Sequence, residues 1–358
     1  MLVKQEKERR KVQISGKSSC MVALPKRWVR EMGLEQGSEV TITKLNSRSL
    51  LVNAQPELGQ GGGREAVVEA GANDTAETIF RKIVSLYVLG FSRIVIDGQR
   101  GLFGSSKKLP LRDLVRRHLI GTESVAEARD RMTVHVLLGY SELSVENALK
   151  KMLLIIDSLR RDAAQALENN DSALAETTAE REDEVGRFGL YVVRQLNLSV
   201  NQGVLPDLKL ENRDTLGYIL IARILERIAS HASSLARAIG GIDRPLAKPM
   251  VQKLMSMNEG ACALVDDAML SLFKRDHRGA DAVIEKSRAF VERETEVIRM
   301  LSGENSQTYY SLHVLMDSQR RIAEYARDIA EVVLDMTVER TLSEHDLAVT
   351  QVPQVQFA

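Results

Sequence analysis

The chain has 358 residues, of which 44% are hydrophobic, and its 49 basic side chains are balanced by 49 acidic ones. This length suggests two or three domains of about 150 residues each. Two cysteines, Cys20 and Cys262, exclude a disulfide framework. The N-terminal sequence has no signal-peptide pattern, and no apolar stretch is long enough to span a bilayer. We therefore expect a cytoplasmic protein without membrane insertion.

The charge is unevenly distributed along the chain. Residues 1–44 contain ten basic and five acidic side chains, a net charge of +5, so the remainder carries −5. A basic segment at one end of an otherwise neutral chain points to a polyanionic partner.

Residues 1–54 have the pattern of a small β domain with one short helix. Four strands are expected, over residues 11–14, 21–24, 40–44 and 50–53. Between the two pairs of strands, Pro25 begins a helix over residues 26–32, and Gly33 ends it. Residues 55–73 contain the Gly-rich sequence QPELGQGGGR and read as a linker.

Residues 74–140 read as a small α/β domain. Asp74 or Thr75 is expected to cap a first helix that runs to about Leu89, and Pro110 to begin a second helix. The second helix and the two strands are expected over residues 111–119, 93–97 and 132–138. Residues 104–108 lack the spacing of a phosphate-binding P-loop, so they read as a polar loop.

From residue 144 onward the sequence is nearly all helical, with helices expected over residues 144–169, 172–201, 213–239, 246–274, 279–302 and 307–342. Six long helices suggest two three-helix bundles, residues 141–241 and 242–345, followed by a tail, residues 346–358. EREDEVGR at residues 180–187 returns as ERETEVIR at residues 292–299. Both copies lie in the middle helix of a three-helix run, which favours a duplicated bundle.

Several motifs hold together at fixed offsets in residues 9–53. They are the glycine turn Gly16-Lys17-Ser18, the run Leu24-Pro25-Lys26-Arg27, and a helix end at Gly33 followed by the turn Gly37-Ser38. This pattern resembles the swapped-hairpin DNA-binding domains of the AbrB/SpoVT/MazE type. Ser38 stands where that family has Asp, and Ser also suits a turn. The resemblance implies a dimer in which two chains interleave their strands.

A second set of motifs lies in residues 144–342. It consists of Leu225-Glu226-Arg227-Ile228, then His231-Ala232, and the acidic sequences of residues 180–185 and 292–297. These residues resemble the PhoU-type phosphate-transport regulators, which are pairs of three-helix bundles. Residues 76–152 look like the intervening segment of archaeal-type proteins that join the two modules. The expected fold is multidomain and mainly α, with a swapped-hairpin β domain, a small α/β domain and two three-helix bundles.

Seven cations are the candidate DNA-binding residues: Arg9, Arg10, Lys11, Lys17, Lys26, Arg27 and Arg30. Such side chains neutralise phosphates and give affinity for double-stranded DNA of any sequence. Together with the resemblances, they predict a regulator of transcription linked to phosphate uptake, acting as a homodimer or higher oligomer. The alternative is an adaptor that does not bind DNA. Its bundles would bind a phosphate transporter component or a kinase, and its hairpin domain would only dimerise.

Six glutamates are candidates for holding a divalent or ferric metal ion. Carboxylates four residues apart share a helix face, as Glu180 with Glu184 and Glu292 with Glu296 would. The PhoU resemblance implies further acidic pairs on the third helices. There the chain has Glu226 and Glu324, but Ser230 and Arg320 in the partner positions. This incomplete set favours ion-paired, solvated helix faces over bound metal, and Arg320 offers an ion pair to the acidic residues opposite.

No pattern in the sequence indicates catalysis. The six histidines are scattered without metal-binding spacing, and no Ser/His/Asp order or Cys/His pairing is found. We therefore expect a protein that is not an enzyme.

Overall fold

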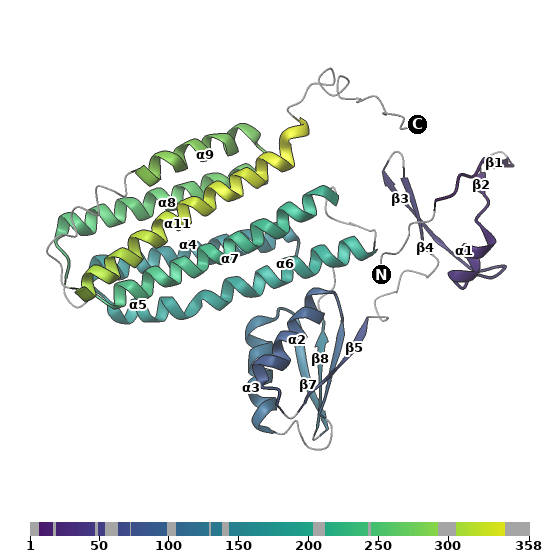
Figure 1. The fold of residues 1–358 in the computed structure, drawn as a ribbon, viewed down its shortest axis with the longest axis horizontal. Coiled ribbons are helices and arrows are strands. Elements are labelled where there is room, and N and C mark those ends of the chain that lie inside the picture. The colour runs from purple at the N-terminus through teal and green to yellow at the C-terminus, as the bar shows by residue number, and fades with distance from the viewer. Residues whose placement is uncertain are drawn as a thin grey trace, which may run out of the picture. The chain divides into compact units, whose positions relative to one another are not determined.

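The computed structural model describes residues 7–16, 19–46, 49–53, 64–71, 73–98, 105–128, 130–137, 143–202, 212–242, 245–292 and 306–340. The chain divides into two compact units, Met1–Gly63 and Arg64–Ala358. The protein is mainly helical, with short β elements near the N-terminus (Figure 1). The two units are described in turn.

The first unit contains two β-hairpins and one short helix. Strand β1 (Val12–Ser15) pairs antiparallel with β2 (Ser19–Val22), and β3 (Thr41–Asn46) pairs antiparallel with β4 (Ser49–Asn53). Helix α1 (Lys26–Glu31) follows Pro25, whose extended backbone suits the N-cap position. The chain leaves α1 through Gly33 at φ 65°, a left-handed conformation that favours glycine. The expected order of strands, helix and hairpin is confirmed.

No large apolar side chain described in this unit is buried. Because the register pairs Val12 with Val22, the side chains of Val12, Ile14 and Val22 share one face of the first hairpin. Ile14 is 83% exposed there, and Ile42 on the second hairpin is 63% exposed. Among the side chains of this unit that the structure describes, ten large apolar ones are exposed: Val12, Ile14, Met21, Val22, Leu24, Met32, Val40, Ile42, Leu50 and Val52. An isolated two-stranded hairpin is marginally stable in water, so this unit lacks the core that would hold it together.

The second unit begins with a four-stranded sheet and two helices. The sheet has the order β5 (Glu65–Glu69), β6 (Arg93–Asp97), β8 (Arg131–Val136) and β7 (Thr122–Ala128), with β5 parallel to β6 and the other pairs antiparallel. Helices α2 (Ala76–Val88) and α3 (Ser105–His118) pack on one face of it (Figure 1). Alternate strand residues such as Ile94, Ile96 and Val134 meet Ile83 and Val115 there in a buried core.

Several expectations for this region need correction. Residues 65–69, expected within the linker, form β5, since their three consecutive apolar residues pair with Ile94, Val95 and Ile96 of β6. Residues 122–128 form β7, which was not expected. Helix α3 begins at Ser105, so residues 105–108 are helical and Pro110 lies inside the helix. Pro110 is the sixth residue of α3 and lies beyond the first turn, so it removes the helix hydrogen bond that an N–H there would donate to Ser106 O.

Eight helical elements follow: α4 (Val145–Asn169), α5 (Ser172–Ala179), η2 (Glu180–Glu182), α6 (Asp183–Gln202), α7 (Asn212–Gly240), α8 (Lys248–Lys274), α9 (His277–Glu292) and α11 (Ser306–Thr337), the last continued by η3 (Val338–Arg340). Side chains cap several of them: Ser144 accepts from Asn147 N–H, and Asp171 accepts from Leu174 N–H. The expected helix boundaries agree closely with the observed ones, except that the expected helix 172–201 is interrupted at residues 180–182. The remainder of the expected helix 279–302 lies outside the described residues after residue 292.

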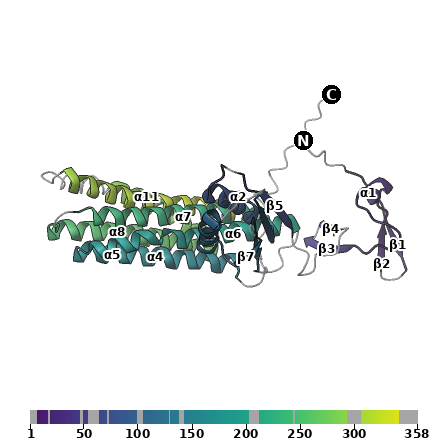
Figure 2. The same ribbon diagram turned by 90° about the horizontal axis from the view of Figure 1, so that it is seen from below.

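The long helices run side by side and share one hydrophobic core (Figure 2). Helix α7 of the first group packs along α11 of the second, and α4 packs against α8. Buried alanines on the facing helices, such as Ala229 and Ala323, permit this close approach. The two groups of helices therefore fold as parts of one unit, in which a buried ion pair from Arg275 to Asp214 also joins them at 2.5 Å.

Candidate functional site

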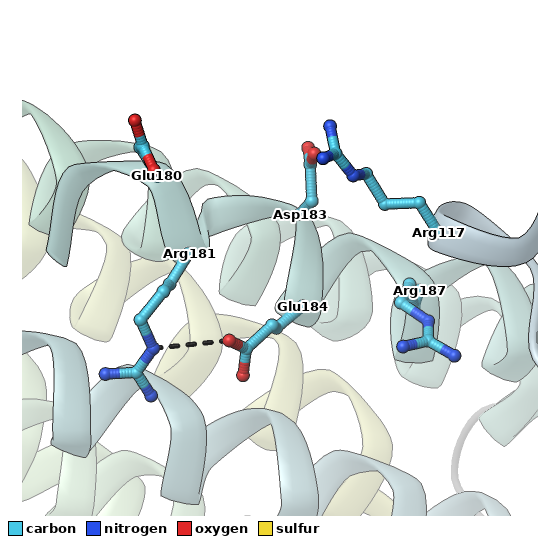
Figure 3. Close-up of a pocket in the computed structure, with 6 residues that line it drawn as sticks. All are labelled: Arg117, Glu180, Arg181, Asp183, Glu184 and Arg187. Carbon is cyan, nitrogen blue, oxygen red and sulfur yellow. Dashed lines mark hydrogen bonds and ion pairs between the residues drawn. The ribbon is translucent and has the colours of Figure 1, made fainter. Parts of the chain in front are cut away.

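A cavity of about 500 Å³ lies where α3 meets the junction of α5 and α6 (Figure 3). Three arginines and three acidic residues line it: Arg117, Glu180, Arg181, Asp183, Glu184 and Arg187. Arg117 comes from the last turn of α3, and the others come from η2 and the first turns of α6. The cavity thus joins the α/β part of this unit to its helical part.

The interruption at η2 separates two candidate metal ligands. Sequence spacing placed Glu180 and Glu184 on one face of a continuous helix, but residues 180–182 form a 3₁₀ turn. This tighter winding changes the angle between successive side chains. Glu180 points away from the other lining residues, whereas Glu184 faces Arg181 (Figure 3). The expected two-carboxylate clamp is therefore not formed by these two residues.

Arg181 neutralises the carboxylates around it. Its Nη1 lies 2.7 Å from Oδ2 of Asp162 on α4, and its Nε lies 3.2 Å from Oε1 of Glu184. Its Nη2 also donates to Ser158 Oγ at 3.3 Å. Two nitrogens of this guanidinium thus tie the junction to α4, and the third pairs with Glu184 of α6.

Glu182 is the carboxylate that reaches α7. Ser230 donates to its Oε1 at 2.5 Å, and Arg237 Nη2 lies 3.2 Å from its Oε2. Residue spacing does not predict this role of Glu182, because the spacing of Glu180 and Glu184 assumes an uninterrupted helix. The 3₁₀ turn instead presents Glu182 to the third helix of the group.

The candidates on the third helices are paired with arginines of their own helices. Glu226 accepts from Arg223 at 2.8 Å, and burial raises the pKa of its carboxyl. Glu324 accepts from Arg320 at 2.5 Å and from Arg321 at 3.1 Å. Arg320 also pairs with Asp317 on α11. The acidic residues expected opposite Arg320 lie in the sequence 292–297, whose side chains are outside what the structure describes.

These pairings do not fit a metal cluster. Among the described residues, no group of three or more His, Cys, Asp or Glu side chains could hold a metal ion. The side chain of Glu292 and the whole of Glu296 lie outside what the structure describes. Three of the described candidates, Glu184, Glu226 and Glu324, are each paired with at least one arginine.

A buried arginine joins α6 to the α/β part next to this cavity. Arg194 is 4% exposed, and its guanidinium donates to the backbone carbonyls of Tyr87 at 2.5 Å, Phe91 at 2.8 Å and Gly90 at 3.5 Å. Asn197, one turn further along, donates to Val88 O at 3.0 Å. These donors satisfy carbonyls at the C-terminal end of α2, which have no partners within the helix. Arg187 and Arg194 are seven residues apart, so they share one face of α6.

Most of the candidate DNA-binding residues lie on the surface of the first unit. Arg9, Arg10, Lys11, Lys26, Arg27 and Arg30 are exposed, whereas Lys17 lies outside the described residues. Arg10 pairs with Glu8, and Arg27 pairs with Glu31 at 2.8 Å. Exposed pairs of this kind are weak, so they leave these cations accessible to a stronger anion.

No helix in the described part of the chain combines the length and the apolar character needed to cross a membrane.

The comparisons with known proteins concern the helical part. The family model for the PhoU domain matches residues 149–239, from α4 to α7. Two similar solved structures are PhoU from Pseudomonas aeruginosa (21% identity, TM-score 0.48) and the phosphate transport system regulatory protein PhoU from Streptococcus pneumoniae (14% identity, TM-score 0.48). They cover 55% and 56% of this chain and 96% of their own chains. No curated protein matches the sequence. The first group of three helices is thus similar to a PhoU domain, and residues 1–54 lie outside that match.

Proposed function

We propose that the chain is a DNA-binding regulator of transcription linked to phosphate uptake and homeostasis. In this proposal, residues 1–54 dimerise as interleaved hairpins and bind duplex DNA. Residues 74–140 couple them to two PhoU-like groups of helices, residues 141–241 and 242–345, which receive the signal. The protein is a regulator and not an enzyme.

The exposed apolar faces of the two hairpins carry the proposal. A unit of about fifty residues folds only if it buries apolar surface, and here each hairpin leaves one face uncovered. A second copy of the same unit fits this need, because an identical hairpin brings an equal apolar face. Pairing through Ile14 and Ile42 would bury side chains that are now 83% and 63% exposed.

The charge of the unit supports DNA as the ligand. Exposed cations lie on the segment before β1 and on α1, and a dimer doubles their number on one assembly. For Arg9, Lys11, Lys26 and Arg30, no ion pair is found with any described residue. Unpaired cations at this density are typical of surfaces that neutralise DNA phosphates.

The similarity of residues 149–239 to a PhoU domain supports the link to phosphate. A component of a phosphate transporter is the partner that this similarity suggests for the helical part. The ion pairs of Arg181, Arg223 and Arg320 favour regulation by a partner or an anionic ligand over a bound metal.

The test is the affinity for duplex DNA over a series of salt concentrations. The probe is the DNA upstream of the gene that encodes the chain. The variant Lys11→Gln/Lys26→Gln/Arg30→Gln removes three exposed cations of the first unit. We expect at least a tenfold loss of affinity and a flatter dependence on salt, since each lost phosphate contact lowers the slope of log K against log salt by about 0.9.

The matched control is Lys274→Gln/Arg278→Gln/Arg288→Gln, which changes the net charge equally but on exposed positions of the helical part. It should bind DNA as the unaltered protein does. If the two triple variants behave alike, or if the intact protein does not bind DNA, the proposal is wrong. The hairpin unit would then only dimerise, and the chain would act as an adaptor for a transporter or kinase.

A further inference from the structure

Two arginines of the cavity between α3 and α6 form no ion pair with the described part of the chain. Arg117 and Arg187 line the cavity from opposite elements, and neither forms an ion pair with a described residue. The Nε atom of Arg187 is buried without a hydrogen-bond acceptor. A buried donor without an acceptor is unfavourable, so an acceptor atom of a ligand at this position would stabilise it.

The acidic residues of the cavity are accounted for by the protein itself. Glu184 is neutralised by Arg181, and Glu180 points away from the other lining side chains (Figure 3). Asp183 and Glu184 lie in the first turn of α6, where negative charge offsets the helix dipole. Asp183 also lies 3.7 Å from Nε2 of His118. Arg117 and Arg187 are therefore the two lining cations without an ion pair to a described residue, and Glu180, which is also without one, points away from them.

We propose that this cavity binds the phosphate group of a small ligand through Arg117 and Arg187. A guanidinium presents N–H donors in a planar fork that matches phosphate oxygens. Two unpaired guanidiniums call for a ligand with about two negative charges, which a phosphate group carries near neutral pH and a single carboxylate does not. The phosphate is either inorganic phosphate or the monoester end of a metabolite.

The size of the cavity suits either source. A volume of about 500 Å³ is within the range of small-molecule sites, roughly 300–1,000 Å³, and leaves room beyond one phosphate group. The carboxylate of Asp183 at the same cavity is an acceptor for hydroxyl or amino groups of a larger ligand.

The position of the cavity gives the ligand a regulatory consequence. Arg187 shares a face of α6 with Arg194, which holds the end of α2. A phosphate that bridges Arg117 of α3 to Arg187 of α6 adds a second link between the α/β part and the helices. This regulatory consequence rests on the proposed function, whereas the binding of phosphate to the cavity does not.

The experiment is isothermal titration of the intact protein, without DNA, with inorganic phosphate, AMP and adenosine. We expect saturable binding of a phosphate-containing probe and none of adenosine. Arg187→Gln and Arg117→Gln should each weaken that binding at least tenfold. The control Arg112→Gln changes an exposed arginine of α3 that does not line the cavity, so its affinity should stay within twofold.

The outcomes separate the two sources. Tighter binding of AMP than of inorganic phosphate supports a metabolite monoester, and equal or tighter binding of inorganic phosphate supports the free ion. If neither binds, or if binding survives both substitutions, the proposal is overturned. If Arg187→Gln does not fold, Arg187→Lys replaces it in the test. This variant keeps the positive charge, so it should retain part of the affinity for phosphate. Because no DNA is present, failure of the DNA-binding proposal would leave this result unaffected.

Discussion

Two glycines of α6 lie three residues apart in opposite surroundings. A Cβ built on Gly186 would meet nothing within 4 Å. A Cβ on Gly189 would lie 2.8 Å from Cδ of Glu226 and closer still to its Oε1. Gly189 thus lets the buried carboxylate of Glu226 lie against α6, where it keeps its ion pair with Arg223.

Substituting these glycines should therefore have different effects. Gly186→Ala should raise the free energy of unfolding by about 0.5–1 kcal/mol, since alanine is the better helix former and space is open. Gly189→Ala should bring no gain or a net loss, because the new methyl group displaces Glu226 from Arg223. Urea unfolding of both variants measures the difference. Equal stabilisation by both would show that Glu226 does not pack against Gly189.

At the cavity, individual residues could be predicted only in part. The sequence identified Glu180 and Glu184, which do line the cavity, but it assigned them a shared helix face that the 3₁₀ turn removes. Arg117 and Arg187 were missed, because they come from segments 70 residues apart in the chain and meet only in the folded unit. The spacing of residues predicts which side chains share a face of one regular helix or strand, but it does not predict which elements contact each other in the fold.

At the scale of elements, strong local signals predicted the structure well. Thr75 caps α2 as expected, with its side chain accepting from Thr78 N–H, and Gly90 ends the helix at φ 92°. Strand β7 was missed for a local reason. The sequence TESVAEA of β7 has a single β-branched apolar residue, Val125, so pairing with β8 and not β-propensity determines its conformation.

The contact of α6 with α2 should be essential for the docking of the α/β part. Arg194→Met removes the donor to three carbonyls while keeping much of the apolar volume. We expect a loss of roughly 1–3 kcal/mol in the free energy of unfolding. Amide hydrogen exchange should quicken at the C-terminal end of α2.

Arg288→Met is the control for this prediction, since Arg288 forms an exposed ion pair with Glu285 on α9. Its loss should cost no more than about 1 kcal/mol. Unchanged exchange at the end of α2 in Arg194→Met would mean that other contacts hold the two parts together.

At the scale of the whole molecule, the two units differ in how they are stabilised. Residues from Arg64 onward bury two apolar cores, one under the sheet and one along the long helices. The first unit buries no large apolar side chain that the structure describes. The sequence indicated this difference only through a family resemblance, because strand patterns do not reveal whether a partner face comes from the same chain or from another copy.

The measurement that tests the account most directly compares Ile14→Glu with Gln13→Glu. These neighbours lie on opposite faces of β1, so each variant adds one negative charge to the same hairpin on a different face. Sedimentation equilibrium gives the mass of each protein, and fluorescence titration gives its affinity for duplex DNA. The account predicts a dimer of 39.9 kDa chains that Gln13→Glu preserves. It predicts that Ile14→Glu, by placing a charge in the shared apolar face, dissociates the hairpin units and lowers DNA affinity at least tenfold. The account would be contradicted if the unaltered protein had the mass of one chain, 39.9 kDa. It would also be contradicted if Ile14→Glu kept both the mass of a dimer and the affinity for DNA.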